Sequence, residues 1–262
     1  MDSSPSFSRA NSFIAAGTVS VIYAVDHNSV IKLRPTSGEF EQQAYDIEIR
    51  SYERLGHYER IVSCEVTEEG LILERGTCLR SILQSVSESA IPWVMKLWWA
   101  LEAAEGLTYI HSKGVIYADI GCHNMIVDNT KYVKFIDFAG SGIDGEDPLV
   151  CYEWCSFKPS LGTGIYSDIF AFGSMLFELE TGCVPYHELE KSLDIGKLVA
   201  VVEGLFSRHQ FPPVDNLAFA SVISGCWNGK YSSIDEVRRD IALLRELDCS
   251  GATLNELGGI GC

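Results

Sequence analysis

The chain has 262 residues and 47% of them are hydrophobic, which is enough apolar material to bury a large core in one domain or in two lobes. Its formal net charge of −16 at pH 7 opposes non-specific nucleic-acid binding, because that binding needs lysine and arginine to neutralise phosphates. No apolar run approaches the roughly 18 to 20 residues that cross a bilayer. We therefore expect an intracellular protein, cytoplasmic or nuclear, that binds neither nucleic acid nor membranes, and the acidic surface leaves open a preference for basic partners.

The nine cysteines are scattered along the chain. They form no CxxC pairs and have no histidine neighbours at the spacing of a metal site, so the sequence predicts neither a disulfide framework nor a zinc site. We expect most of them to be reduced and to serve as small apolar side chains. The first eleven residues are polar and rich in serine, and we expect residues 1–11 to be a flexible tail.

The first third of the chain predicts a β-rich unit with one helix. Residues 12–33 have strand-type composition broken by a turn at 26–28, and further strands are expected over 61–66 and in the run 70–76. Residues 40–55 carry apolar side chains at close to helical spacing and end at a glycine, which predicts a helix with Glu48 at the border of its apolar face.

The rest of the chain predicts mainly helices. We expect helices over 78–86 and 91–112, a buried helix within 164–186, and shorter helical segments over 195–247. Residues 115–141 separate these helices with a stretch of strand-like sequence. We place the boundary between two lobes at about residues 75 and 76, and a C-terminal tail at 251–262.

The stretch 115–141 concentrates the polar chemistry of the sequence. Asp119 follows an apolar run, Asn124 comes five residues later, and a second strand-like run leads to Asp137 in Asp-Phe-Ala. Phosphoryl transfer from a nucleotide needs a carboxylate facing the acceptor hydroxyl and oxygen ligands for Mg²⁺. The other interpretation is a hairpin in which these residues serve only as turn formers.

This stretch resembles the catalytic loop and the magnesium loop of eukaryotic protein kinases, whose patterns are His-Arg-Asp-x-x-x-x-Asn and Asp-Phe-Gly. The segment SDIFAFG followed by TGCVPY resembles the buried central helix of the same family, and the similarity extends from about residue 12 to residue 247. Asp168 lies near the start of that helix, where we expect its carboxylate to accept backbone N–H groups of the catalytic loop. His111, before the loop, is expected to be a buried structural residue.

The resemblance implies an α+β, two-lobed kinase-like fold, with a small β-rich N-terminal lobe that contains one helix and a larger helical lobe over about 76–250. It implies ATP and Mg²⁺ as cofactors. The implied catalytic set is Asp119, Lys32 and Glu48, in which Lys32 pairs with the nucleotide phosphates and Glu48 orients the lysine. The implied magnesium ligands are Asn124 and Asp137. The implied nucleotide-binding positions are Ala15, Gly17, Ser20, Ile22, Lys32, Leu73 as gatekeeper, and the backbone of Glu74 and Gly76.

Several positions depart from the family pattern. Only Gly17 remains of three glycines in the phosphate loop, Ala139 replaces the glycine after Asp-Phe, and Gly121 stands where serine/threonine kinases place a lysine. Ala118 replaces the arginine that pairs with an activation-segment phosphate, so we expect activity that does not depend on such a phosphate. Tyr152 and Ser156 in the activation segment are candidate modification sites.

The anchor of the activation segment also differs. In the family a glutamate there pairs with an arginine near the end of the domain. Glu153 and Pro159 are the candidates for the first position, and Tyr231 and Ser232 occupy about the second, so we expect other packing to replace the ion pair. The resulting interpretation is an ATP- and magnesium-dependent kinase of protein hydroxyls, with serine or threonine taken from the family. The alternatives are a nucleotide-binding pseudokinase that acts as a scaffold, and a small-molecule phosphotransferase of the aminoglycoside or choline kinase type.

Overall fold

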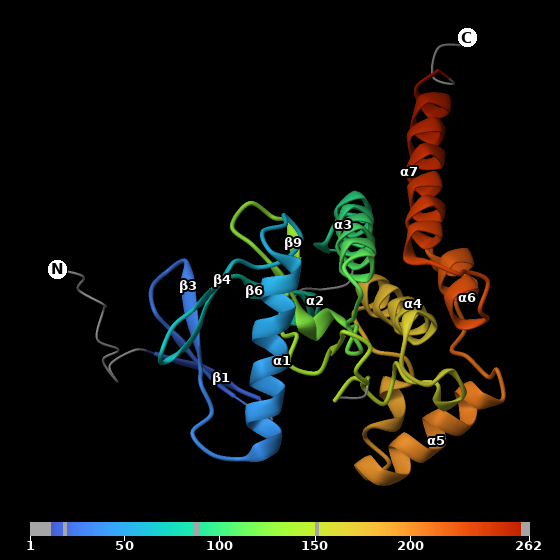
Figure 1. Cartoon of the computed structure of the whole chain (residues 1–262). Coiled ribbons are helices and arrows are strands. Elements are labelled where there is room, and N and C mark those ends of the chain that lie inside the picture. The colour runs from blue at the N-terminus through green and yellow to red at the C-terminus, as the bar shows by residue number, and fades with distance from the viewer. Residues whose placement is uncertain (1–11, 18–19, 86–89, 150–151, 258–262) are drawn as a thin grey trace.

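Two units of different character make up the chain (Figure 1). The structure, a computed structural model, describes residues 12–17, 20–85, 90–149 and 152–257, with side chains up to residue 245. The predicted tail at 1–11 therefore lies outside the described residues. The smaller unit contains β1 (Phe13–Ala16), β2 (Val21–Ala24), β3 (Ser29–Leu33), α1 (Glu39–Leu55), β4 (Cys64–Val66) and β5 (Gly70–Glu74).

The five strands of the smaller unit form one antiparallel sheet in the order β1-β2-β3-β5-β4. Asp26 closes the β2–β3 turn by accepting the backbone N–H groups of Asn28 and Ser29 at 2.7 and 2.8 Å. Helix α1 lies beside this sheet (Figure 1) and buries Tyr45, Glu48, Tyr52 and Leu55, which recur at three- and four-residue spacing on one face. Glu48 is thus carried inward by the apolar face next to it.

The larger unit is mainly helical. It contains β6 (Thr77–Cys78), α2 (Leu79–Ser85), α3 (Trp93–Ser112), β7 (Val115–Ile116), the 3₁₀ helix η2 (Cys122–Asn124), β8 (Met125–Val127), β9 (Val133–Phe135), β10 (Gly142–Ile143), η3 (Pro159–Leu161), α4 (Ile165–Thr181), η4 (His187–Leu189), α5 (Ile195–Ser207), α6 (Ala220–Trp227) and α7 (Ile234–Leu257). Helix α7 continues beyond the predicted boundary at residue 250. It extends away from the rest of the molecule at its C-terminal end (Figure 1).

Helix α4 is the centre of the larger unit, as its apolar sequence predicts. Every residue from Ser167 to Leu179 is buried, so the helix is enclosed on all sides. Helix α6 packs directly on it, because a Cβ atom at Gly173 would lie only 2.7 Å from Cys226 Cβ. The indole of Trp227 donates to Ser174 Oγ at 3.1 Å and fixes the rotation of the two helices.

The β8–β9 hairpin joins the two units. The backbone N–H of Phe135 donates to Arg60 C=O at 2.8 Å, and the N–H of Val62 donates to Phe135 C=O at 3.2 Å. From the other side, Glu102 on α3 accepts the N–H of Val133 at 2.9 Å. The hairpin between Asn124 and Asp137 is therefore held by both units.

The predicted α+β, two-lobed architecture is confirmed, with the β-rich lobe first in the chain. No helix in the described ranges is long and apolar enough to span a bilayer. Cys122, Cys155 and Cys226 are buried free thiols, and burial raises the pKa of each above its usual value.

Candidate active site

Lys32 on β3 forms an ion pair with Glu48 on α1 and another with Asp137 after β9. Lys32 Nζ lies 2.6 Å from Glu48 Oε2 and donates a hydrogen bond to Asp137 Oδ1 at 2.9 Å. The lysine and glutamate side chains are almost fully buried, whereas the Asp137 side chain is 44% exposed. The sequence therefore anticipated the pairing of Lys32 with Glu48, and the structure adds Asp137 as a third member.

The charges of this cluster depend on one another. Burial would lower the pKa of Lys32, but Asp137 and Glu48 outweigh it and raise that pKa above its usual value. The ammonium is therefore charged at neutral pH. Burial raises the pKa of Glu48 above its usual range, and Lys32 beside it opposes the rise. Removal of the lysine would leave a buried carboxylate without its cation.

The backbone around the cluster is held in uncommon conformations. Ala118 and Asp137 have φ angles of 65° and 56°, the left-handed region that residues with a Cβ atom rarely adopt. Three aromatic rings nearby pack edge to face. The ring centroid of Phe138 lies 5.1 Å from that of Tyr52 on α1 and 5.2 Å from that of Tyr117 in the catalytic-loop stretch. The Tyr117 hydroxyl also donates to Ile136 C=O. These three buried rings connect α1 to the loop that carries Asp119 and to the loop that carries Asp137.

Asn124, the last residue of η2, contacts Asp119. Asn124 Nδ2 donates to Asp119 Oδ2 at 2.8 Å and to Asp119 C=O at 3.1 Å. The Asn124 C=O accepts the backbone N–H of Ile136 at 3.1 Å, which brings the residue next to the start of the Asp137 loop. Because the amide nitrogen is committed to Asp119, the amide oxygen is the atom left to act as an acceptor or a metal ligand.

Asp168 fixes the loop from below. Its two carboxylate oxygens accept the backbone N–H groups of Tyr117 and Ala118 at 3.0 and 2.9 Å, and the side chain is fully buried. His111 Nε2 lies 2.7 Å from the same carboxylate, and the hydroxyl of Tyr152 donates to it at 2.7 Å. The predicted contacts of Asp168 with the loop backbone are confirmed.

The predicted phosphate-loop residues form the β1–β2 hairpin. Ala15 lies opposite Ile22, and Ile22 lies opposite Lys32, so the three residues form one row across the sheet. The N–H of Gly17 donates to Ser20 C=O at 2.9 Å and closes the hairpin turn. The row ends at Lys32. The roles of these residues toward a nucleotide stay predictions.

Two of the predicted hinge residues, Leu73 and Glu74, end β5, and the third, Gly76, follows the strand. Leu73 is buried opposite Val30, and a Cβ atom at Gly76 would lie 2.7 Å from Ile126 Cδ1 and 2.8 Å from Val127 C=O. The absence of a side chain at Gly76 thus lets the chain pass close to β8.

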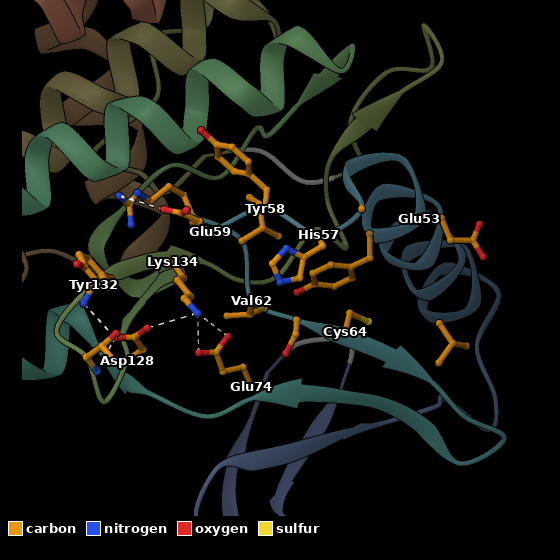
Figure 2. Close-up of a pocket in the computed structure, with 17 residues that line it drawn as sticks. Glu53, His57, Tyr58, Glu59, Val62, Cys64, Glu74, Asp128, Tyr132 and Lys134 are labelled. Carbon is orange, nitrogen blue, oxygen red and sulfur yellow. Dashed lines mark hydrogen bonds and ion pairs between the residues drawn. The ribbon is translucent and has the colours of Figure 1, made fainter.

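The side chain of Glu74 lines a hollow of about 660 Å³ between α1, β4 and the β8–β9 turn (Figure 2). There Lys134 Nζ pairs with Glu74 Oε1 at 2.7 Å. Lys32, Asp119, Asn124 and Asp137 do not line this hollow, so it is separate from these predicted site residues.

Comparison with known proteins identifies the family. A family profile described as "Protein tyrosine and serine/threonine kinase" matches residues 20–238. The chain belongs to the protein kinase family. It is 31% identical over 147 residues to a probable serine/threonine-protein kinase of Dictyostelium discoideum, an alignment that covers 53% of this chain and 10% of that protein.

Two further relatives differ in the acceptor that their names state. The chain is 25% identical over 198 residues to the serine/threonine/tyrosine-protein kinase HT1 of Arabidopsis thaliana, covering 71% of this chain and 48% of that protein. It is 31% identical over 163 residues to the tyrosine-protein kinase receptor svh-2 of Caenorhabditis elegans, covering 57% and 14%. The kinase domain described here therefore spans less than half the length of each of these relatives.

The donor set of the kinase domain fits a nucleotide with Mg²⁺. Asp137 keeps a partly exposed carboxylate, and Asn124 contacts Asp119 through its amide nitrogen, which leaves its amide oxygen available. Two oxygen donors of the kind that Mg²⁺ prefers therefore lie at the two ends of the β8–β9 hairpin. The buried ammonium of Lys32 beside Asp137 offers a fixed positive charge to phosphate oxygens. Magnesium, when bound, would supply charge neutralisation at the phosphates.

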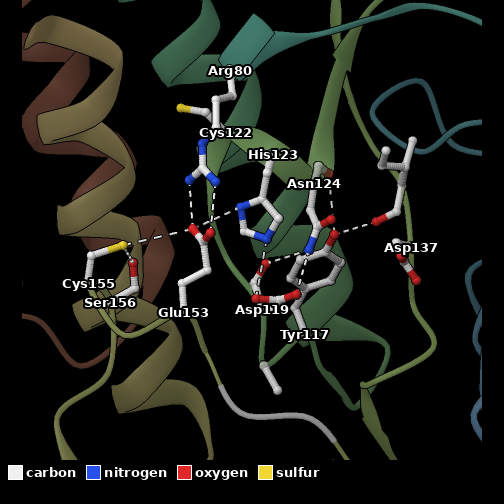
Figure 3. A network of polar contacts seen from close by, with 12 residues as sticks. Arg80, Tyr117, Asp119, Cys122, His123, Asn124, Asp137, Glu153, Cys155 and Ser156 are labelled. Atoms are coloured by element: carbon white, nitrogen blue, oxygen red, sulfur yellow. Dashed lines mark hydrogen bonds and ion pairs between the residues drawn. The ribbon is translucent and has the colours of Figure 1, made fainter. Parts of the chain in front are cut away.

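Sequence reasoning missed a network on the other side of Asp119 (Figure 3). His123 Nε2 lies 3.4 Å from Asp119 Oδ1, and its Nδ1 lies 3.1 Å from Glu153 Oε2 in the activation segment. Glu153 in turn receives two N–H groups of Arg80 at 2.8 and 2.6 Å. Burial would lower the pKa of His123, but the two carboxylates raise it to about 10. The available signal was a histidine four residues after Asp119 and two residues after the unexplained Gly121.

The activation segment also corrects two expectations. Tyr152 and Ser156 are only 5% and 4% exposed, and Tyr152 is bonded to Asp168, so neither hydroxyl is open to modification in this conformation. Glu153 is not the anchor glutamate, because it pairs with Arg80 and His123. Tyr231, at the expected arginine position, bonds Asp240 at 2.8 Å instead. At Glu153 and Tyr231, other contacts thus take the place of the family ion pair, as the sequence predicted.

Proposed function

We propose that this chain is an ATP- and magnesium-dependent protein kinase that transfers the γ-phosphate to protein hydroxyls, with serine or threonine as the acceptor. The observation that carries the proposal is the closed Lys32–Glu48–Asp137 cluster, with 2.6 and 2.9 Å contacts to one buried ammonium. Family membership supports the same reaction class.

Each residue has a physical task in this proposal. Lys32 positions the phosphates and Glu48 holds the lysine, while Asn124 and Asp137 hold the magnesium. Asp119 orients the acceptor hydroxyl and accepts its proton. Because phosphoryl transfer is accelerated mainly by positioning and by electrostatic stabilisation, a domain that keeps these five groups keeps most of what the reaction needs.

The choice of acceptor rests on the relatives rather than on the site. Serine/threonine kinases are among them, but the names also include a tyrosine kinase. The substrate is proposed to be a protein, and the formal charge of −16 favours a basic one. An intracellular location, cytoplasmic or nuclear, stays a prediction.

A nucleotide-binding pseudokinase is the second candidate function. Gly121 leaves the loop without the lysine of the family pattern, and two of the three phosphate-loop positions are Ala15 and Ser20. Such changes would slow turnover while leaving the Lys32 cluster able to bind a nucleotide.

One paired experiment separates these functions. Purified wild-type chain is compared with Asp119→Asn and with Asp46→Asn, an exposed control on α1. We expect Mg-ATP to raise the melting temperature of all three, and radiolabelled ATP to phosphorylate a basic protein substrate only with wild type and Asp46→Asn. A thermal shift without turnover by wild type supports the pseudokinase, and phosphorylation of an aminoglycoside in place of protein supports a small-molecule phosphotransferase.

A phosphatase arm tests the expected independence from an activating phosphate. Ala118 cannot pair with a phosphate, and Tyr152 is buried against Asp168. Treatment of the purified chain with phosphatase should therefore leave turnover unchanged, and loss of turnover would contradict this expectation.

A further inference from the structure

The ring of His123 lies against Gly121, beside Asp119, in the space that a side chain at position 121 would need. Gly121 has extended backbone, with φ −179°, so no left-handed conformation requires glycine there. Space does require it: a Cβ atom would lie 2.5 Å from His123 Nδ1 and 2.6 Å from its Cε1. The imidazole therefore fills the place where a side chain at position 121 would begin.

The imidazole also lies within ion-pair distance of a carboxylate on each of two sides. Nε2 faces Asp119 Oδ1 at 3.4 Å and Nδ1 faces Glu153 Oε2 at 3.1 Å, so the ring cannot swing away without losing both carboxylates. Its side chain is only 23% exposed. Figure 3 shows the ring lying between these two acidic side chains.

The far end of this chain of contacts is anchored in the helical lobe. Arg80 on α2 donates to both oxygens of Glu153 and also to Glu178, a buried residue of α4. Burial would raise the pKa of Glu153, but Arg80 and His123 lower it below its usual range, so the carboxylate stays charged. Arg80 thus connects the activation segment to the central helix α4, and Glu153, which Arg80 holds, contacts His123.

We propose that His123 is a second positioning residue for Asp119, beside Asn124, and that through Glu153 and Arg80 it makes the orientation of Asp119 depend on the position of the activation segment. The inference rests on the proposed function, because Asp119 is the acceptor-orienting group only if the chain transfers phosphate. The proposal explains why Gly121 and His123 occur together. It also gives Glu153 of the activation segment the connection to the catalytic loop that a phosphate cannot make at Ala118.

Two conservative substitutions distinguish the two ring nitrogens. The amide nitrogen of glutamine takes the place of Nε2, which faces Asp119, and that of asparagine takes the place of Nδ1, which faces Glu153. We expect His123→Asn, which loses the contact to Asp119, to lose about tenfold to a hundredfold in kcat, and His123→Gln, which loses only the contact to Glu153, to lose clearly less, with the KM for ATP unchanged in both. His27→Ala, an exposed histidine of the β2–β3 turn, is the matched control. Equal kcat for the glutamine and asparagine variants would overturn the proposal.

Coupling to the activation segment is tested by a double-mutant cycle. Glu153→Gln should lower kcat in the wild-type background and have little further effect in His123→Ala, because the path from Glu153 to Asp119 is then already broken. Additive effects on kcat would show that Glu153 acts independently of His123, and would refute the coupling.

A stability cycle tests the shared volume without any need for turnover. Gly121→Ala should lower the melting temperature by about 2 to 12 °C, the range expected for overpacking in a domain of this size, and should be nearly neutral in the His123→Ala background. Equal losses in both backgrounds would remove the basis of the proposal. If wild type transfers no phosphate, the proposed function fails, and this cycle alone then decides whether His123 holds the place beside Asp119.

Discussion

Substitution of Asp168 by alanine should loosen the loop that carries Asp119 and destabilise the whole domain. The fully buried carboxylate takes four contacts: the N–H groups of Tyr117 and Ala118, the Tyr152 hydroxyl and His111 Nε2, at 2.7 to 3.0 Å. Alanine removes both acceptor oxygens at once and takes from the buried N–H groups of Tyr117 and Ala118 the carboxylate that they contact, whereas the Tyr152 hydroxyl keeps Ser167 Oγ at 2.8 Å.

The magnitude follows from the environment of the carboxylate. A hydrogen bond to a charged group contributes about 1.5–3 kcal/mol, but bonds that share one side chain do not add. The better guide is the ~3–5 kcal/mol lost when one partner of a buried charged network is removed. Since 1 kcal/mol corresponds to ~2–4 °C in a domain of this size, we expect the melting temperature of Asp168→Ala to fall by about 6–20 °C.

The assay combines thermal unfolding with amide hydrogen exchange. Asp46→Ala, on the exposed face of α1, should change the melting temperature by less than ~2 °C. Exchange should accelerate at the amides of Tyr117 and Ala118 in the Asp168 variant, well below the unfolding temperature. If Asp168→Ala melts within about 2 °C of wild type and both amides keep their protection, the anchoring of the loop by this carboxylate is refuted.

Three other perturbations test separate parts of the fold. Gly76→Ala should cost ~1–3 kcal/mol in urea unfolding, because its Cβ would lie 2.7 Å from Ile126 Cδ1, whereas Gly196→Ala on exposed α5 should be neutral or slightly stabilising. Glu153 has a pKa below its unfolded value, so its stabilisation is present above about pH 4.5 and is lost as the pH falls below that value. The difference in melting temperature between wild type and Glu153→Gln should therefore shrink as the pH is lowered from about 4.5. Arg50→Ala should cost only ~0.2–1 kcal/mol, and less at high salt, because its ion pairs with Asp144 and Glu146 are 38–56% exposed; a cost of several kcal/mol would contradict this ranking.

The features that the sequence predicted well are those that recur with the period of a helix or a strand. The apolar spacing of α1 placed Glu48 at the edge of the buried face, and Glu48 is indeed buried against Lys32. The nearly continuous apolar text of α4 predicted a central helix, and its first turn presents Asp168 to the loop. Periodicity reports burial directly, and burial was sufficient to position these side chains.

The activation segment has no such period, and expectations there were less accurate. The interpretation of Glu153 as a candidate anchor relied on its place in the chain, whereas its partner Arg80 lies 73 residues earlier, on a different element. Tyr152 looked like an exposed hydroxyl because nothing in its neighbourhood is periodic, yet it reaches the buried Asp168. Pairing between loops depends on how the helices bring them together, and that information is not contained in local composition.

A departure from a family pattern has a different meaning when its neighbours are considered with it. Taken alone, Gly121 is the loss of a lysine. In the structure it is half of an exchange, because the His123 ring occupies the space above it and no side chain fits at position 121 while that ring stays. Restoring a longer side chain at 121 alone should therefore damage the domain rather than improve it. The loss of one cation near Asp119 and the gain of an imidazole in contact with Asp119 are thus one change in how this kinase domain holds its carboxylate.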